Sequence, residues 1–259
     1  MESNNKFECY FCNNKFNKRN YYHNHLIQNH KLDIRLKTLL YNIDNYKKVI
    51  DDEQNRRINK IISKLKKCKI IFDVGSGNGS FTEKLLSKKK NFICHLFEPI
   101  NNLSELSLKK FSNNKNVLIN NFGLSNYNEK KYIYRSISHK NFGLNTYLDN
   151  MNLKNYVEES TILSTLDQYC KYNKIDKIDF VKINTDGYEA NVIDGFFRTL
   201  RSLKNKPYIL IKLKWGSKHP NWQYCKNIFI KLLKIGYYET SFDRVKDNSY
   251  VLFEPINNL

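Results

Sequence analysis

The stretch that most constrains the fold is FDVGSGNGSF, residues 72–81. An apolar run that begins at Ile70 leads into three glycines, Gly75, Gly77 and Gly79, at every second position. Glycine has no side chain and accepts backbone conformations closed to other residues, so a turn of this kind lets another group approach the backbone closely. The stretch predicts a strand, a glycine turn and a helix, with a ligand at the turn.

From Lys69 onward, apolar runs alternate with helical stretches, which predicts a mainly parallel sheet with helices on both faces. Two final runs, GYYETSF and SYVLFEP, flank a short polar turn and predict an antiparallel hairpin that closes the sheet. The polar region 121–163 is expected to be an insertion of short strands. The earlier strand runs are KIIFDV, FICHLFE, NVLIN, IDFVKIN and YILIKLK, and helices are expected over 79–88 and 222–235.

Near the N-terminus, Cys9 and Cys12 are followed after twelve residues by His25 and after four more by His30. Tetrahedral Zn²⁺ takes four such sulfur and nitrogen ligands, two from a hairpin and two from one face of a helix. The stretch 7–30 resembles the C2H2 zinc finger family, which implies a small ββα fold around one structural zinc ion. One finger covers about three base pairs. Nucleic-acid tethering and protein docking are therefore equally open as its use.

Three regions are expected: a zinc finger over 1–31, a basic helical linker over 32–66 and a sheet domain over 67–259. The linker has Ile58, Ile61, Ile62 and Leu65 at helical spacing.

The formal net charge of +19 favours nucleic acid, RNA or DNA, as a partner. An AT-rich genome, such as a viral one, would also enrich Lys, Asn and Ile. The N-terminus is too polar for a signal peptide, and no apolar run is long enough to span a membrane. Four scattered cysteines, Cys68, Cys94, Cys170 and Cys225, predict free thiols in a reducing intracellular compartment, the cytoplasm or nucleus.

The glycine turn departs from the dinucleotide pattern G-x-G-x-x-G, because Ser80 stands where the third glycine belongs. Glu98 ends the next strand, nineteen residues after Gly79, where a carboxylate accepts hydrogen bonds from ribose hydroxyls. Asp73 would repel a phosphate and suits a ligand with a cationic end, such as S-adenosylmethionine. An NAD-dependent oxidoreductase is therefore disfavoured, and a turn without any ligand is the remaining alternative.

Five segments occur in a set order: FDVGSGNGSFT, FEP, NNFGLSN, STLDQY and IDFVKINTDGYEANVIDG. In this order they resemble the FkbM-type methyltransferase family, from about residue 70 to about residue 213. The family implies a Rossmann-like methyltransferase domain, S-adenosylmethionine and O-methylation, mostly of sugar or natural-product hydroxyls. By position, the resemblance implies a cofactor loop made by Asp73, Gly75, Ser76, Gly77, Asn78 and Gly79. It also implies that Glu98 is the carboxylate that binds the ribose and that Asn121 lies beside the adenine. Asp167 matches a Leu-Asp pair that opens a helix, and the motif after the fourth strand is matched by Lys182, Gly187 and Glu189.

Three positions differ from the family pattern. Family members usually have Asp at the position of Asn184, Glu at that of Asp186 and Glu at that of Lys212. Asn184 stays a candidate for cofactor binding, but an Asn side chain cannot act as a general base. The candidate catalytic residues are Lys182, Asp186, Glu189 and Lys212, although Glu189 fits a helix cap equally well and Lys182 fits a solvated strand residue.

Two hypotheses follow from these exchanges. The first is an active methyltransferase with a targeting finger, whose acceptor is nucleic acid, RNA before DNA, since both Asn184 and Lys212 shift the local charge toward positive. A sugar hydroxyl is the alternative acceptor. The second is a nucleic-acid-binding zinc-finger protein whose methyltransferase fold has lost catalysis.

Overall fold

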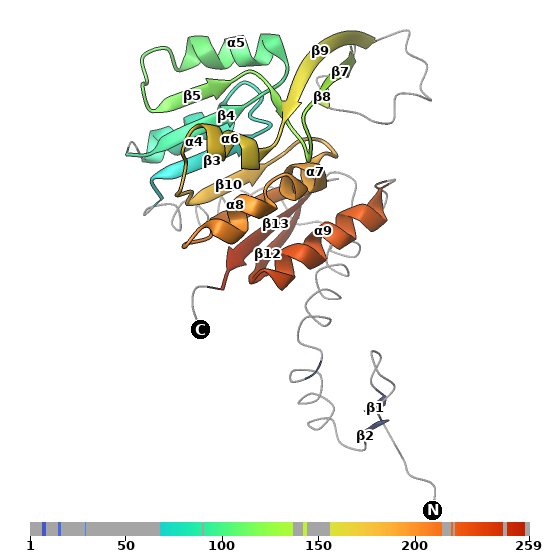
Figure 1. Cartoon of the computed structure of the whole chain (residues 1–259). Helices are drawn as coiled ribbons and strands as arrows, with labels where there is room; N and C mark the ends of the chain where they lie inside the picture. The colour runs from blue at the N-terminus through green and yellow to red at the C-terminus, as the bar shows by residue number, and fades with distance from the viewer. Residues whose placement is uncertain are drawn as a thin grey trace, which may run out of the picture.

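In the computed structural model (Figure 1), the described residues are 7–8, 15–16, 29, 68–89, 91–136, 142–143, 156–213, 219, 221–245 and 248–256. Most of them belong to a seven-stranded sheet with helices on both faces. The α/β fold, its parallel strands and the final antiparallel hairpin are confirmed. The strands are β3 (Ile70–Val74), β4 (Ile93–Phe97), β5 (Val117–Asn120), β10 (Phe180–Ile183), β11 (Tyr208–Leu213), β12 (Tyr237–Val245) and β13 (Asn248–Pro255).

The order of the strands in the sheet is β12-β13-β11-β10-β3-β4-β5. From β3 the chain moves outward through β4 to β5, and it later returns to β10 on the other side of β3. The five neighbouring strands β11, β10, β3, β4 and β5 run parallel. Strand β13 is antiparallel to both β11 and β12. In open sheets of this kind, ligands bind outside the carboxyl ends of the strands where the strand order reverses. That point lies here between β3 and β10.

Helices cover both faces of the sheet because successive strand residues point to opposite sides. Phe72 of β3 belongs to the apolar cluster with residues of α6, α7, α8 and α9 on one face, whereas its neighbour Ile71 belongs to the cluster with Leu85 of α4 on the other. In Figure 1, α6, α8 and α9 lie in front of the sheet. The helices are α4 (Ser80–Lys88), α5 (Asn101–Lys110), α6 (Leu166–Tyr172), α7 (Glu189–Asp194), α8 (Phe197–Ser202) and α9 (Trp222–Lys234).

Helix α9 shows why these segments are helical. Its buried residues recur at helical spacing, which makes one apolar stripe that faces the sheet. Burying side chains of this size stabilises the fold by about 1.5–3 kcal/mol each. The stripe consists of Cys225, Ile228, Phe229, Leu232 and Leu233.

The insertion forms a sheet of its own, with strand order β6-β9-β7-β8. The expectation of short strands holds for β6 (Gly123–Leu124) and β8 (Phe142–Gly143) and is wrong for β7 (Glu129–Ser136) and β9 (Tyr156–Ser164). Ile133 and Leu163 of this second sheet pack against Ile100 and Tyr188, which lie in the connections after β4 and β10. This apolar cluster holds the second sheet beside the carboxyl ends of the central strands.

Little of the N-terminal region belongs to the described residues. Strands β1 (Phe7–Glu8) and β2 (Lys15–Phe16) pair antiparallel, and Asn29 is helical. The four expected zinc ligands, Cys9, Cys12, His25 and His30, lie outside the described residues, and so does the expected linker helix.

Cys68, Cys94, Cys170 and Cys225 are buried free thiols, as predicted. Within the described ranges, no helix is long and apolar enough to cross a membrane.

Candidate functional site

The loop after β3 is a tight turn that lies against two neighbouring segments. The backbone N–H groups of Gly75 and Ser76 both donate to the carbonyl of Phe97, at 2.9 and 3.1 Å. A side chain at Gly75 would put Cβ 1.9 Å from the carbonyl oxygen of Asn184, and Gly75 has a positive φ of 66°. Glycine is therefore required here by both space and backbone conformation, because the loops after β3 and β10 touch at this residue.

Glu98, at the end of β4, ties this loop to the next one. Its Oε2 accepts from the backbone N–H of Gly77 at 2.8 Å, and its Oε1 accepts from that of Ile100 at 3.0 Å. Burial raises the pKa of Glu98, and these two hydrogen bonds and the charge of Lys182 oppose that rise. A carboxylate has about four lone-pair positions. Two acceptor positions therefore remain for ligand hydroxyls.

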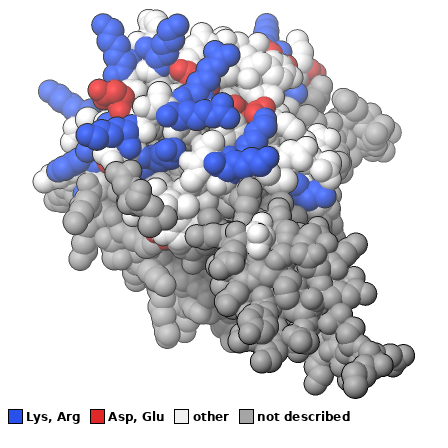
Figure 2. Space-filling view, turned by 60° about the horizontal axis from the view of Figure 1, so that its bottom comes forward, with Lys and Arg blue, Asp and Glu red and all other residues white. Residues whose placement is uncertain are grey.

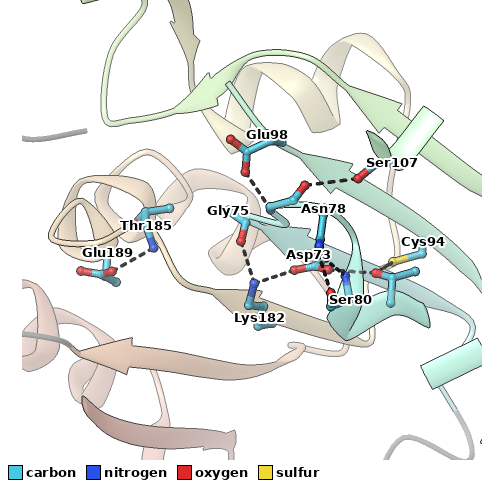
Figure 3. Close-up of polar contacts among 12 residues, drawn as sticks. Asp73, Gly75, Asn78, Ser80, Cys94, Glu98, Ser107, Lys182, Thr185 and Glu189 are labelled. Carbon is cyan, nitrogen blue, oxygen red and sulfur yellow. Dashed lines mark hydrogen bonds and ion pairs between the residues drawn. The ribbon is translucent and has the colours of Figure 1, made fainter. Parts of the chain in front are cut away.

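Asp73 and Lys182 form a buried ion pair beneath the loop (Figure 3). Lys182 Nζ lies 2.8 Å from Asp73 Oδ1 and also donates to the carbonyl of Gly75 at 2.8 Å. The other carboxylate oxygen of Asp73 accepts from the hydroxyl of Thr82 at 2.9 Å. The Asp73 side chain is 0% exposed. Sequence reasoning expected the cationic end of a ligand opposite Asp73, whereas the structure places a cation of the protein there.

The turn after β10 is held by the carboxylate of Glu189. This carboxylate accepts from the backbone N–H groups of Thr185 at 2.9 Å and Gly187 at 3.1 Å. Burial raises the pKa of Glu189. Between these two residues, Asp186 has a positive φ of 50°, which is uncommon for a non-glycine residue. Glu189 thus acts here as the cap of its own turn, and Asp186 stands at the tip.

Three buried side-chain oxygens flank the point where the strand order reverses. Ser76 Oγ, Asn184 Oδ1 and Thr185 Oγ1 have no hydrogen-bond partner among the described residues. Leaving a buried polar group unpaired costs about 1–3 kcal/mol. Because the three come from the loops after β3 and β10, they fit a polar ligand bound between these loops, as a cofactor with hydroxyl, amino and carboxylate groups would be.

Comparison with known families agrees with this geometry. Residues 73–245, well over half of the chain, match the methyltransferase FkbM domain. The chain belongs to the FkbM methyltransferase family. This FkbM domain is that of an S-adenosylmethionine-dependent methyltransferase. No curated protein matches the chain.

One solved structure shows the same fold, and two others resemble the chain, all at low sequence identity. The O-methyltransferase from Bacillus cereus in complex with SAH is 11% identical over 90% of this chain and 95% of that one, with a TM-score of 0.50. A putative caffeoyl-CoA O-methyltransferase from Staphylococcus aureus is 12% identical, with coverages of 92% and 99% and a TM-score of 0.49. TrmK of M. capricolum in complex with S-adenosyl-homocysteine is 17% identical, with coverages of 78% and 68% and a TM-score of 0.44.

The other predicted cofactor residues of this FkbM domain lie at the same edge of the sheet. Asn121, just after β5, donates from Nδ2 to the carbonyl of Glu98 at 3.0 Å. Asn78 Oδ1 accepts from the backbone N–H of Ser80 at 3.2 Å, where α4 begins. Both asparagines thus stabilise loops at the carboxyl ends of the central strands. Gly79 begins α4 with a φ of 75° and lies against the ring of Phe111.

Lys212 is brought beside a residue that sequence reasoning missed. It stands near the end of β11 and is directly opposite Tyr250 of β13 in the antiparallel register. Burial raises the pKa of Tyr250, and the charge of Asp186 raises it further. The carboxyl edge of the sheet therefore brings together Asp186 of the turn after β10, Lys212 of β11 and Tyr250 of β13. Only the position of Tyr250 on the predicted last strand could have suggested it.

His219 is a second residue that sequence reasoning missed. Its Nε2 lies 2.9 Å from the carbonyl oxygen of Gly187, so Nε2 carries the proton and donates. Its Nδ1 accepts from the backbone N–H of Asn221 at 3.1 Å. Both ring nitrogens are thus hydrogen-bonded to backbone groups, and one of them attaches His219 to the turn after β10. A titratable residue shortly after a predicted strand was the available signal.

Asp167 lies away from this edge. In α6 its carboxylate accepts from the backbone N–H groups of Arg198 at 3.1 Å and Thr199 at 2.7 Å, so it caps the start of α8. Over the part of the chain that the structure describes, no group of His, Cys, Asp and Glu is placed to hold a metal ion.

Proposed function

We propose that this FkbM methyltransferase transfers a methyl group to a hydroxyl oxygen of a nucleic acid, RNA before DNA. One observation carries the choice of acceptor. The edge of the sheet that borders the cofactor position has Asn184 and Lys212 in place of two acids, in a chain with a formal net charge of +19. A positive local field attracts a phosphate-bearing acceptor and offers nothing to a neutral sugar.

Each part of the site has a task in this reaction. Glu98 would accept hydrogen bonds from the ribose hydroxyls of the cofactor, and Asn121 supports the backbone of that loop. The oxygens of Ser76, Asn184 and Thr185 would pair with polar groups bound between the two loops. S-adenosylmethionine, when bound, supplies an electrophilic methyl group.

The proton of the acceptor hydroxyl needs a base. Glu189 is buried and its carboxylate holds its own turn, whereas Asp186 is half-buried at the tip of that turn, where an acceptor could reach it. Asp186 is the better candidate for the base. Lys182 is a positioning residue, because its ammonium holds the carbonyl of Gly75 and the carboxylate of Asp73. Lys212 would attract a phosphate of the acceptor.

The test supplies a labelled methyl donor to pools of RNA, DNA, sugar and protein and identifies the labelled product. We expect labelled RNA, and we expect Lys212→Glu, which restores the usual family acid, to depress methyl transfer far more than binding of S-adenosylhomocysteine. Binding is measured by calorimetry. Labelling of a neutral sugar, unaffected by salt and by Lys212→Glu, would return the acceptor to a sugar hydroxyl.

The exchange at Asn184 also favours a second candidate, a nucleic-acid-binding protein that no longer transfers methyl groups, because an Asn side chain cannot take a proton. Binding of S-adenosylhomocysteine would not separate the two candidates. Labelling of any acceptor would exclude the second one.

The zinc finger is proposed to target the enzyme, by binding nucleic acid or a protein. We further propose that 1–31, 32–66 and 67–259 are separate units. The free energy of zinc binding to a finger contributes directly to the free energy of its folding. A chelator should therefore release one zinc ion and unfold residues 7–30 while the circular dichroism of the sheet domain persists. Cys12→Ser should bind no zinc and respond to the chelator no further. Loss of the whole fold would contradict the division into units.

A further inference from the structure

A groove of about 1190 Å³ lies on the face of the sheet that α6 and α8 cover, away from the edge proposed to bind the cofactor. It is bounded by α6 and α8, with Lys231 of α9 and the connection before β7 at its rim. Five Lys or Arg residues and three Asp residues line it. The cations are Lys171, Lys174, Arg198, Arg201 and Lys231.

Two of the three acids are already engaged within the protein. Asp167 accepts two backbone N–H groups of α8, and Asp194 accepts from Lys231 at 3.1 Å and from Tyr224 at 3.0 Å. Lys171, Lys174 and Arg198 make no ion pair with any described residue. Five cations against three carboxylates leave the groove with a formal charge of +2, and Lys171 of α6 and Arg198 of α8 stand on its two sides. Figure 2 shows Lys and Arg gathered, with few Asp and Glu among them, on the described part of the face turned forward from the bottom of Figure 1.

Arg198 is the informative member of this set. It stands in the first turn of α8, where the helix dipole disfavours a cation, and that turn holds no acidic residue. The dipole of α8 therefore does not explain the positive charge at this position, where the one carboxylate at the helix start is that of Asp167, bound to the backbone. Lys171, in the last turn of α6, would be favoured by the dipole and carries less weight.

The remaining lining suits bases as well as phosphates. Tyr127, which also lines the groove, is 51% exposed, so its ring is available for a base to stack on. Asn128 donates from its amide to the side-chain oxygen of Gln168, which leaves the carbonyl oxygen of Asn128 and the amide N–H groups of Gln168 for a ligand. Cations along a groove together with an exposed aromatic ring are typical of sites for single-stranded nucleic acid.

We propose that this α6–α8 groove binds the sugar-phosphate backbone of a single-stranded nucleic acid, with a base stacked on Tyr127. The proposal extends the proposed function by giving the acceptor a holding surface outside the cofactor edge. Asp194 and Gly195 line the groove at the end of the six-residue helix α7, whose other end follows the turn at Asp186. Six helical residues span about 9 Å. A strand held in the groove therefore lies a few nucleotides from the reacting edge.

The test uses the full chain and a fluorescein-labelled mixed-sequence RNA of about 12 nucleotides, within the range of single-strand sites. Lys171→Ala with Arg198→Ala should raise the dissociation constant about tenfold. The plot of log affinity against log salt should lose about 1.4 units of slope, the value for two phosphate contacts on a single strand. Tyr127→Ala should raise the dissociation constant about fivefold through lost stacking. On binding RNA, amides of 166–172 and 197–202 should exchange more slowly.

The matched control is Lys109→Ala with Lys115→Ala, which removes the same charge from two exposed residues near β5 and should change affinity less than twofold. Equal losses of RNA affinity in the two double variants would refute the proposal that the groove binds single-stranded nucleic acid. Tighter binding to anionic phospholipid vesicles or inorganic polyphosphate than to the RNA would also refute it. S-adenosylhomocysteine binding should be the same in all variants. The wild type could fail to bind S-adenosylhomocysteine while the groove variants still lose RNA affinity as expected. That outcome would refute the proposed methyl transfer and leave the proposed RNA-binding groove supported.

Discussion

Lys182 Nζ lies 2.8 Å from Asp73 Oδ1, in a pair whose side chains are 12% and 0% exposed. Removing one member of a buried ion pair leaves an uncompensated charge and costs about 3–5 kcal/mol. We expect Lys182→Met to lower the free energy of unfolding by this amount in a urea titration followed by circular dichroism. Adding Asp73→Asn, which keeps an acceptor for Thr82, should recover much of the loss.

Lys110 provides the control for this prediction. Its ammonium also lies 2.8 Å from a carboxylate, that of Glu83, but the two side chains are 26% and 58% exposed. Exposed pairs contribute about 0–1 kcal/mol. If Lys182→Met and Lys110→Met had the same effect, burial would not be what makes the Asp73 pair important.

Gly75→Ala should disable the cofactor loop. The new methyl group would meet the carbonyl of Asn184 at 1.9 Å, so the loops after β3 and β10 must separate. We expect at least a tenfold loss of S-adenosylhomocysteine affinity by calorimetry, on the scale of 1.4 kcal/mol per tenfold change. Gly77→Ala is the control, since it also has a positive φ, of 58°, but has open space around it. It should cost about 1–2 kcal/mol of stability and little affinity, and a larger effect of Gly77→Ala on affinity would contradict the steric explanation.

Glu98→Ala should weaken binding of S-adenosylhomocysteine by about 1.5–3 kcal/mol, the scale of hydrogen bonds to a charged group. Glu98→Gln, which keeps one acceptor oxygen, should lose less. Glu105→Ala, on the exposed side of α5, is the control and should bind like the wild type. A folded wild type that fails to bind S-adenosylhomocysteine in calorimetry would refute the cofactor site itself.

His95 predicts a pH dependence of stability. Burial lowers the pKa of His95 from 6.5 to about 4, and its Nδ1 lies 2.7 Å from the hydroxyl oxygen of Tyr169. Between these two pKa values the unfolded chain binds a proton that the folded protein excludes, so stability is full above pH 6.5 and falls as the pH drops toward 4. The loss approaches about 3 kcal/mol, at 1.36 kcal/mol per pKa unit.

Urea titrations across this pH range check the effect. His95→Gln should flatten the slope relative to the wild type, whereas Tyr169→Phe, which keeps the imidazole, should retain it. An unchanged slope in His95→Gln would assign the pH dependence to other groups.

The sequence predicted the strands of the central sheet because each contains a short apolar run, such as IIF in KIIFDV and ILI in YILIKLK. The glycine loop and Glu98 were also recognisable, since both depend on residue type next to a strand end. The Asp73–Lys182 pair was not recognisable, because it depends on β10 pairing with β3 across 109 residues. The unpaired oxygens of Ser76 and Thr185 could not be foreseen either, since pairing is decided by neighbours from distant segments.

The place of β13 in the sheet has a practical consequence for shortened versions of this protein. It is the last described strand in the chain, yet it lies between β11 and β12 and forms hydrogen bonds with both. A chain cut before Asn248 would expose the backbone of two strands at once, and unpaired strand edges recruit other chains into aggregates. Truncations that dissect function should therefore be made from the N-terminal side, because trimming the other end opens the sheet in its interior.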